Sequence, residues 1–326
     1  MLRRLLGRPA RSAAAIDVEL NAVVSALRGM GNAGSSKMLT PANIEAMLAA
    51  KTTNAKQLYR MGQAIFENAQ VDANPAELDK VKTVWKTAME LGDQNAKFSY
   101  ARLLKQGQGF PKPDLISSTM LFKQLADAKH AWGTFAYAQA LHNGDGIKVN
   151  LPKAFELYLL CAKSDIPPAY MAVANMYITG AGVDKNVPEA LQWYTKAAES
   201  GDMHAKSLLG DWYFNGDYGV PVDRARGLAL RMEAASAGIP HAMFNMGCLH
   251  AEGAADVGVE RNDIVAFQLF QQAAMKGHGL AIMNVAVMLR DGVGVSRNVQ
   301  VARTWLEGLA PYDMQAKELL AKLPAE

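Results

Sequence analysis

Apolar and small residues recur along most of this chain with the period of an amphipathic helix. Ala205, Leu209, Gly210 and Tyr213 are spaced i, i+4, i+5 and i+8, so they gather on one face of a helix. A glycine loop and a second amphipathic stretch follow, and this hairpin pattern returns about every 36 residues. Aligning the loops places the start of each leading helix at Ala96, Gly133, Ala169, Ala205, Ala242 and Ala281.

A weaker copy of the hairpin precedes these six. It begins near Gln57, where Met61-Gly62 stands in the place that Leu209-Gly210 and Met246-Gly247 hold later. One further helix, Asp313 to Lys322, follows Leu309 and is expected to cap the stack. The pattern therefore predicts an all-α solenoid of about seven helix-turn-helix repeats over residues 57–322, with no β-sheet.

Each inter-helix loop carries signals that end one helix and begin the next. Glycine supplies the positive φ that stops a helix, and an Asn or Asp four residues later can cap the next one by accepting a backbone N–H. The expected caps are Asn150, Asn186, Asp223, Asn262 and Asn298. The trailing helices are expected to end at Gly201, Gly238 and Gly277.

Glycine also occurs in the middle of leading helices, at Gly210 and Gly247. It costs roughly 0.5–1 kcal/mol there relative to alanine, so its recurrence predicts close contact between helices. A bulky residue at these positions should clash.

The consensus A-x-x-x-L-G-x-x-Y-x-x-G-x-G-V, followed by a capped helix with A-x-x-W-Y-x-K-A-A-x-x-G, resembles the SEL-like repeat (SLR) family, which is related to the tetratricopeptide repeats. The match is best over 169–201, clear over about 96–310, weak over 57–95 and absent before 55. The resemblance implies a right-handed α/α solenoid whose leading helices line a concave face, and an adaptor role in assembling other proteins. Several secreted members carry a cysteine pair in each hairpin. This chain has only Cys161 and Cys248, in different repeats, which does not support an oxidising compartment.

The first fifteen residues, MLRRLLGRPARSAAA, alternate arginine with leucine and contain no acid, and their apolar run is too short for a secretory signal. This composition predicts a mitochondrial presequence and places the protein in the matrix; an ordinary basic tail is the alternative. Without the four arginines of that segment, residues 16–326 hold 30 basic and 31 acidic residues. No stretch is long and apolar enough to span a membrane.

The sequence thus divides into four parts: a presequence at 1–15, an N-terminal helical segment with a Gly/Ser linker at 16–55, the repeat solenoid at 56–312, and a capping helix and tail at 313–326. Residues 16–30 have the spacing of an amphipathic helix, and GNAGSS at 31–36 reads as the linker. That helix could dock on another protein or pack back onto the array.

Related hairpins bind partners through set positions of the leading helix, which implies a groove on the concave face. The implied groove residues are Phe98, Arg102, Phe135, Gln139, Met171, Asn175, Asp211, Phe214, Phe244 and Arg290. The aromatic positions could equally serve packing between helices. Asn175 and Asp211 carry the groove hypothesis, since polar groups there could pair with the backbone of a bound segment.

Catalytic residues, a metal site and a cofactor are not expected. Four of the six histidines fall just before a repeat start, so they recur with the repeat and not with metal-ligand spacing.

The predicted function is a non-enzymatic mitochondrial scaffold or adaptor that binds subunits of a large complex, the ribosome or a respiratory complex. An RNA-binding solenoid is the first alternative, disfavoured by the near-neutral charge of 16–326. A hydrolase on SLR repeats is the second, disfavoured because the pair Cys248 and His241 lacks an orienting group in the sequence.

Overall fold

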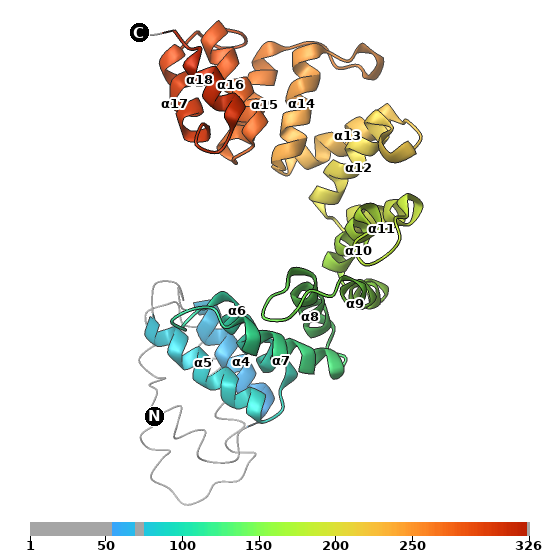
Figure 1. Cartoon of the computed structure of the whole chain (residues 1–326), viewed down its shortest axis with the longest axis vertical. Helices are drawn as coiled ribbons and strands as arrows, with labels where there is room; N and C mark the ends of the chain where they lie inside the picture. The colour runs from blue at the N-terminus through green and yellow to red at the C-terminus, as the bar shows by residue number, and fades with distance from the viewer. Residues whose placement is uncertain (1–53, 69–74, 325–326) are drawn as a thin grey trace, which may run out of the picture. The chain divides into compact units, whose positions relative to one another are not determined.

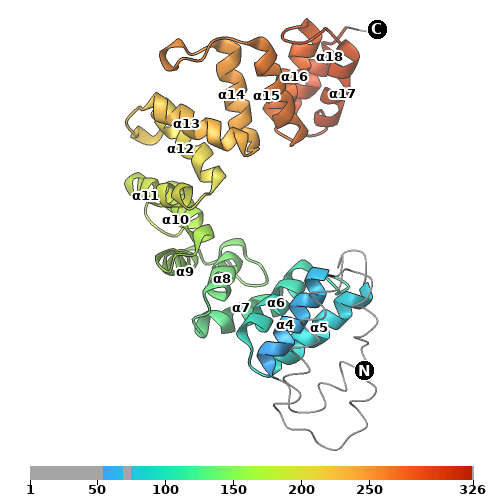
Figure 2. The ribbon, with the colours of Figure 1, turned by 180° about the vertical axis from the view of Figure 1, so that it is seen from behind.

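The computed structural model describes residues 54–68 and 75–324. Figure 1 follows the helices in chain order from blue to red, and Figure 2 shows the same ribbon from behind. The helices of these residues are α4 (Ala55–Asn68), α5 (Pro75–Glu90), α6 (Gln94–Gln106), α7 (Leu115–Asp127), α8 (Ala131–Asn143), α9 (Leu151–Lys163), α10 (Pro167–Thr179), α11 (Val187–Glu199), α12 (Met203–Asn215), α13 (Arg224–Ser236), α14 (Pro240–Glu252), α15 (Asp263–Met275), α16 (Gly279–Asp291), α17 (Val299–Leu309) and α18 (Met314–Ala321).

The described part of the chain contains no β-strand, and its one extended pairing is a bridge between Ala254 and Val259. Short 3₁₀ turns, η2 (Asp217–Gly219) and η3 (Ala255–Val257), lie in the loops after α12 and α14. The prediction of an all-α solenoid is confirmed. The presequence, the helix at 16–30 and the linker at 31–36 lie outside the described residues.

Two compact units make up the described chain. The N-terminal unit holds the residues up to 169 and 181–183, and the C-terminal unit holds 170–180 and the residues from 184 onward. Each unit stacks antiparallel hairpins of a leading and a trailing helix. The prediction from the sequence was a single solenoid over 56–312, and it did not separate these two units.

The weak first repeat is a true hairpin, because α4 packs along α5 in the N-terminal unit. Leu58 and Met61 are fully buried there, and Trp85 is 4% exposed. Gly62 lies directly under the Trp85 ring, where a Cβ would collide with the indole. The glycine therefore makes room for the largest side chain of this hairpin.

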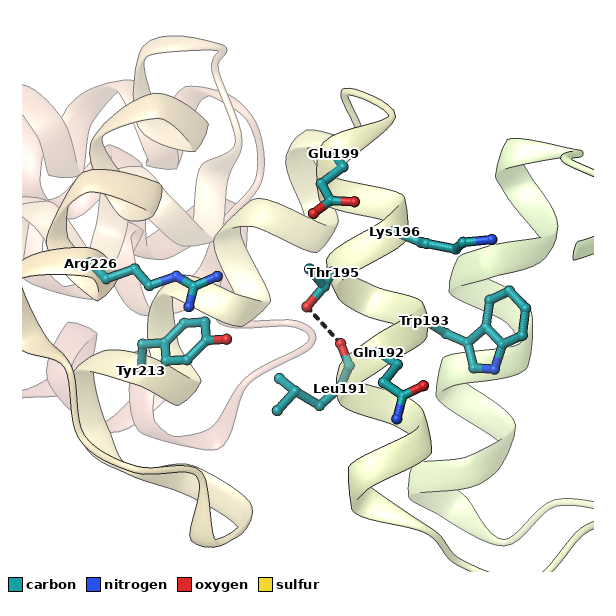
Figure 3. A pocket seen from close by; sticks show the side chains of 8 residues that line it. All are labelled: Leu191, Gln192, Trp193, Thr195, Lys196, Glu199, Tyr213 and Arg226. Carbon is teal, nitrogen blue, oxygen red and sulfur yellow. Dashed lines mark hydrogen bonds between the residues drawn. The ribbon is translucent and has the colours of Figure 1, made fainter.

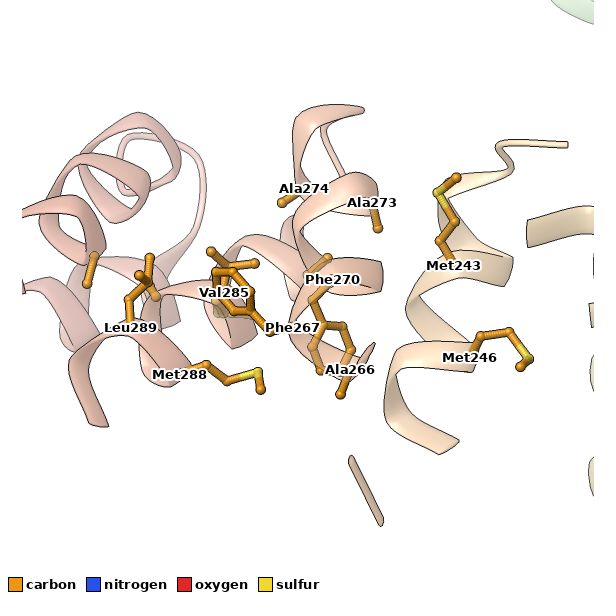
Figure 4. Packing of buried hydrophobic residues seen from close by; sticks show 14 of the residues in the cluster. Met243, Met246, Ala266, Phe267, Phe270, Ala273, Ala274, Val285, Met288 and Leu289 are labelled. Atoms are coloured by element: carbon orange, nitrogen blue, oxygen red, sulfur yellow. The ribbon is translucent and has the colours of Figure 1, made fainter. Parts of the chain in front are cut away.

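One buried apolar cluster of the C-terminal unit extends from α13 to α18. Figure 4 labels Met243 and Met246 on the helix beside that of Phe267 and Phe270, with Val285, Met288 and Leu289 on the other side of the phenylalanines. The expected last helix is present as α18, begins after the cap Asp313, and adds Ala316 to this core. It covers α17, as the sequence predicted for a capping helix.

The expected caps all form. The side chains of Asn150, Asn186, Asp223, Asn262 and Asn298 each accept a backbone N–H three residues later. Asp114 caps α7 in the same way. Each such cap satisfies one of the free N–H groups at a helix start.

In some of the loops the second glycine has a packing role that the sequence did not reveal. In the loops before α9 and α17, Gly146 and Gly294 lie against the backbone at the start of the preceding trailing helix, at Leu115 and Asp263. A Cβ would collide with that backbone, and φ is positive at both glycines. The loops therefore sit closely on the neighbouring repeat, and only glycine allows the approach.

Candidate functional site

All ten predicted groove residues lie on leading helices, as the sequence placed them: two on α6, two on α8, two on α10, two on α12, one on α14 and one on α16. Among the described residues, no hydrogen bond, ion pair or ring contact joins one of the ten directly to another. Each is instead engaged locally or exposed. Their role in partner binding stays a prediction.

In the N-terminal unit the two phenylalanines pack inside their own hairpins. The Phe98 ring lies 5.9 Å from the Phe122 ring, and the Phe135 ring lies 5.5 Å from that of Tyr158. Phe135 is only 9% exposed. Arg102 is exposed and Gln139 is partly exposed, so these two side chains are the ones available to a partner.

In the C-terminal unit Asn175 is exposed, and its side-chain oxygen accepts a hydrogen bond from the Tyr194 hydroxyl. Tyr194 is buried, and burial raises the pKa of its phenol to about 12. The phenol therefore stays neutral and keeps its proton to donate. Met171, four residues before Asn175, is partly buried on the same helix.

Asp211 is the most heavily bonded of the ten residues, and its side chain is 14% exposed. Its Oδ1 atom accepts hydrogen bonds from Arg231 Nε at 2.7 Å and from Asn245 Nδ2 at 2.8 Å. Its Oδ2 atom lies 2.7 Å from His241 Nε2. The carboxylate thus joins the trailing helix of its own hairpin to the leading helix of the next.

His241 is the titratable end of this network. The hydrogen bond to Asp211 raises the pKa of His241 above its ordinary value, against the effects of burial and of Arg231. The ring of His278 lies 6.0 Å from that of His241. Burial, and then the charge of His241, lower the pKa of His278. The surroundings therefore favour the protonated form of His241 and the neutral form of His278.

The remaining groove residues are partly or wholly packed. Phe214 is 7% exposed and lies 4.2 Å from the guanidinium carbons of both Arg224 and Arg231. The Phe244 ring stacks on His278 at 4.6 Å. Arg290 makes a two-pronged ion pair with the neighbouring Asp291, with both N···O distances at 2.7 Å.

The sequence analysis missed Arg231, His241 and Asn245 as hydrogen-bond partners of Asp211. A signal was present for Arg231. It stands eight residues after its helix cap, where the other trailing helices carry a buried apolar side chain, among them Phe122, Tyr158, Tyr194, Phe270 and Leu306. A charge at that position requires a partner, which Asp211 supplies.

Two of the histidines serve as helix caps. The Nδ1 atom of His130 accepts the N–H of Gly133 at 3.0 Å, and that of His278 accepts the N–H of Ala281 at 3.3 Å. Burial lowers the pKa of both rings, which favours the neutral form that can accept. The recurrence of histidine before repeat starts thus has, at these two sites, a capping function.

The thiols have the character of packed side chains. Cys161 is buried and its thiol donates to the Ala131 carbonyl oxygen. Burial raises the pKa of Cys161 to about 11 and also raises that of Cys248, so both favour the unreactive thiol. Across residues 54–68 and 75–324, no group of three or more potential ligand residues is arranged to hold a metal ion. No helix there is long and apolar enough to cross a membrane.

Comparison with protein families decides what these hairpins are. The Sel1 repeat model matches six consecutive segments: 94–130, 133–165, 167–202, 204–238, 240–278 and 279–307. The chain belongs to the Sel1 repeat family. The six segments reproduce the register read from the loops, and the α4–α5 hairpin lies before the first of them. The resemblance to SEL-like repeats is confirmed.

Solved Sel1 repeat structures have the same fold. The Sel1 repeat protein from Oxalobacter formigenes shares 23% identity at a TM-score of 0.69, over 78% of this chain and 100% of that chain. The protein c5321, a protective antigen of uropathogenic Escherichia coli strains displaying an SLR fold, shares 26% identity at a TM-score of 0.63. That alignment covers 73% of this chain, which spans half the length of c5321. Among curated proteins, no relative matches this Sel1 repeat protein.

Proposed function

We propose that this Sel1 repeat protein is a non-enzymatic adaptor that binds segments of other proteins along the leading helices of its units. The observation that carries the proposal is that six consecutive Sel1 repeats account for most of the described chain. Their recurring residues serve capping and packing, so the variable leading-helix positions are left to recognise partners. Protein interaction is also the usual role of such repeat arrays.

The proposal extends to where the adaptor works. The arginine-rich, acid-free segment at 1–15 supports import into the mitochondrial matrix. The near-neutral charge of 16–326 favours protein partners over RNA, because nucleic-acid binding requires a basic surface. The partners we propose are subunits of a large mitochondrial complex, the ribosome or a respiratory complex.

A reporter experiment tests the location. Residues 1–15 fused to a fluorescent protein should enter mitochondria, and replacing Arg3, Arg4, Arg8 and Arg11 by glutamate should prevent import, because the positive charge of the segment is reversed. Unchanged delivery of the glutamate variant would reject the targeting segment.

A charge reversal tests the binding surface. Arg102 is exposed on α6, and Lys123 is exposed on α7 of the same hairpin. Tagged wild type, Arg102→Glu and Lys123→Glu are purified from isolated mitochondria, and the recovered subunits are quantified by mass spectrometry. Arg102→Glu should lose a set of subunits that Lys123→Glu retains. Equal recovery by both variants would place binding away from the leading helix of this hairpin.

The alternatives have their own readouts. If the purified protein without residues 1–15 shifts labelled RNA at physiological salt, the RNA-binding alternative replaces the adaptor. If it hydrolyses ester or peptide substrates and Cys248→Ala abolishes that activity, the hydrolase alternative replaces it.

A further inference from the structure

A cavity of about 550 Å³ opens between α11, α12 and α13 of the C-terminal unit. In Figure 3, Leu191, Thr195 and Glu199 occupy the side of α11 that faces Tyr213 and Arg226. The three α11 residues are spaced i, i+4 and i+8, so they form one stripe along the helix. The cavity involves none of the ten predicted groove residues.

Opposite α11, the cavity is lined by Arg226, whose guanidinium stacks on the ring of Tyr213. The guanidinium carbon of Arg226 lies 4.1 Å from the centre of the Tyr213 ring. Stacking occupies the flat face of a guanidinium and leaves its N–H edge free to bind a carboxylate with two hydrogen bonds. Within the described residues, no carboxylate forms an ion pair with Arg226. The cavity thus presents an oriented cation that no carboxylate of the described residues neutralises through an ion pair.

Comparison within the repeats shows that this arrangement is specific to one hairpin. Arg226 stands three residues after the cap Asp223, and the matching residue after Asn150 is Lys153. Lys153 pairs with Glu156, three residues further along its helix, at 2.6 Å. The residue three positions after Arg226 is Ala229, so the same neutralisation is missing here.

Thr195 and Glu199, which line the cavity from α11, restrict which ligands can bind. The Thr195 hydroxyl donates to the Leu191 carbonyl oxygen at 2.8 Å, so the proton of this hydroxyl is already used within α11. Glu199 adds a negative charge on the α11 side, and no ion pair involving it occurs among the described residues. That carboxylate disfavours a continuous polyanion such as a nucleic acid.

We propose that this cavity is a second docking site, which takes a short protein segment carrying one carboxylate side chain next to an apolar side chain. The carboxylate pairs with the N–H edge of Arg226, and the apolar side chain lies against Leu191 and the Tyr213 ring. The site rests on the proposed function only in that the partner is a protein.

The probe is a fluorescein-labelled peptide, blocked at both ends, in which glutamate alternates with leucine. Two control peptides carry glutamine or lysine in place of glutamate. Anisotropy titrations with the purified full chain should show the glutamate peptide binding at least about tenfold more tightly than either control, because a charge-assisted hydrogen bond is lost in both. The Arg226 Nε–H signal in ¹⁵N spectra should shift only with the glutamate peptide.

Three variants locate the effect. Arg226→Gln removes the charge, and Ala229→Glu gives Arg226 a partner on its own helix, so each should weaken binding of the glutamate peptide about tenfold. Lys153→Gln, at the matching position of another hairpin, should leave binding unchanged. Circular dichroism spectra and melting curves confirm that each variant is folded; all three sites are exposed on helix surfaces.

Equal binding of the three peptides, or unchanged binding by Arg226→Gln, would overturn the site. This outcome is separate from failure of the adaptor role, because Arg102 belongs to the other unit and does not line this cavity. If the peptide binds through Arg226 but Arg102→Glu loses no mitochondrial subunit, the cavity is supported as a binding site and the proposed groove is rejected.

Discussion

Two neighbouring hairpins of the C-terminal unit, α12–α13 and α14–α15, bury different kinds of side chain at the same position of the trailing helix. Eight residues after the cap, α13 carries Arg231 and α15 carries Phe270, and these are 5% and 2% exposed. Each faces a glycine of its leading helix, Gly210 or Gly247. The backbone plan is therefore shared, while one buried side chain is charged and the other is apolar.

The difference shows what a buried charge requires. Phe270 needs only apolar neighbours, such as Phe244, whose ring centre lies 5.6 Å from that of Phe270. Arg231 needs Asp211 at 2.7 Å, and the same carboxylate also binds His241 of the next hairpin. A buried ion pair adds little net stability, but losing one partner leaves an expensive unpaired charge. Replacing Asp211 should therefore destabilise the α12–α13 hairpin strongly. The α14–α15 hairpin has no equivalent position, because Phe270 does not depend on a charged partner.

The largest expected effect is at Asp211. Asp211→Ala should destabilise the fold by about 3–5 kcal/mol, because Arg231 is left buried without its carboxylate. Urea unfolding followed by circular dichroism measures this. The exposed Asp184→Ala is the control and should change stability by less than about 0.5 kcal/mol.

The double variant Asp211→Leu with Arg231→Phe rebuilds the apolar solution of α14–α15 and should recover most of the lost stability. A single Asp211→Ala no more harmful than Asp184→Ala would show that Arg231 does not depend on this carboxylate. The same result decides whether Asp211 can be used to test partner binding, since a destabilised variant would lose partners without touching them.

The facing glycines should differ next. A Cβ on Gly210 would lie 3.0 Å from the Arg231 backbone nitrogen and 3.1 Å from the Gly227 carbonyl oxygen, whereas one on Gly247 would meet the Phe270 ring at 2.7 Å. Backbone cannot move aside as a side chain can. Gly210→Ala should therefore cost about 1–3 kcal/mol. Gly247→Ala should cost less, because its neighbour is a side-chain ring and not backbone. The gain of roughly 0.5–1 kcal/mol in helix propensity applies to both substitutions and does not distinguish them. Equal losses in urea unfolding would contradict this distinction.

The caps of the two hairpins should behave alike. Asp223 accepts the N–H of Arg226 at 3.0 Å, and Asn262 accepts that of Val265 at 3.1 Å. Asp223→Ala and Asn262→Ala should each cost about 1 kcal/mol. Melting curves of both variants provide the measurement, and a large difference between them would mean that the hairpins differ at their helix starts as well as in their cores.

The smallest effect is a pH dependence at the junction of the hairpins. In NMR titrations His241 should titrate above its ordinary pKa and His278 below it. The stabilisation from His241 is complete below about pH 6.5 and is lost as the pH rises through its raised pKa. That from His278 has the opposite sign: it is present above about pH 6.5 and is lost as the pH falls. A His241 midpoint unchanged by Asp211→Asn would show that their hydrogen bond does not set this pKa.

Much of this molecule follows from local patterns in the sequence. The helix starts at Asn150, Asn186 and Asp223, the close contact at Gly210, and the final helix after Asp313 were all predictable. Capping, helical periodicity and glycine spacing act over a few residues, so the chain carries these signals in one dimension. Repetition of the pattern then identified the family.

Only the tertiary structure decided which side chains meet. Arg231 and His241 are 20 and 30 residues from Asp211 in sequence, and packing of α12, α13 and α14 brings them to one carboxylate. Arg226 reaches the Tyr213 ring for the same reason. Such pairs depend on how helices rotate and approach one another, which the repeat pattern leaves open because the substituted positions depart from it. The sequence alone determined the hairpins, their register and their caps; contacts between helices determined the charged core and the candidate sites.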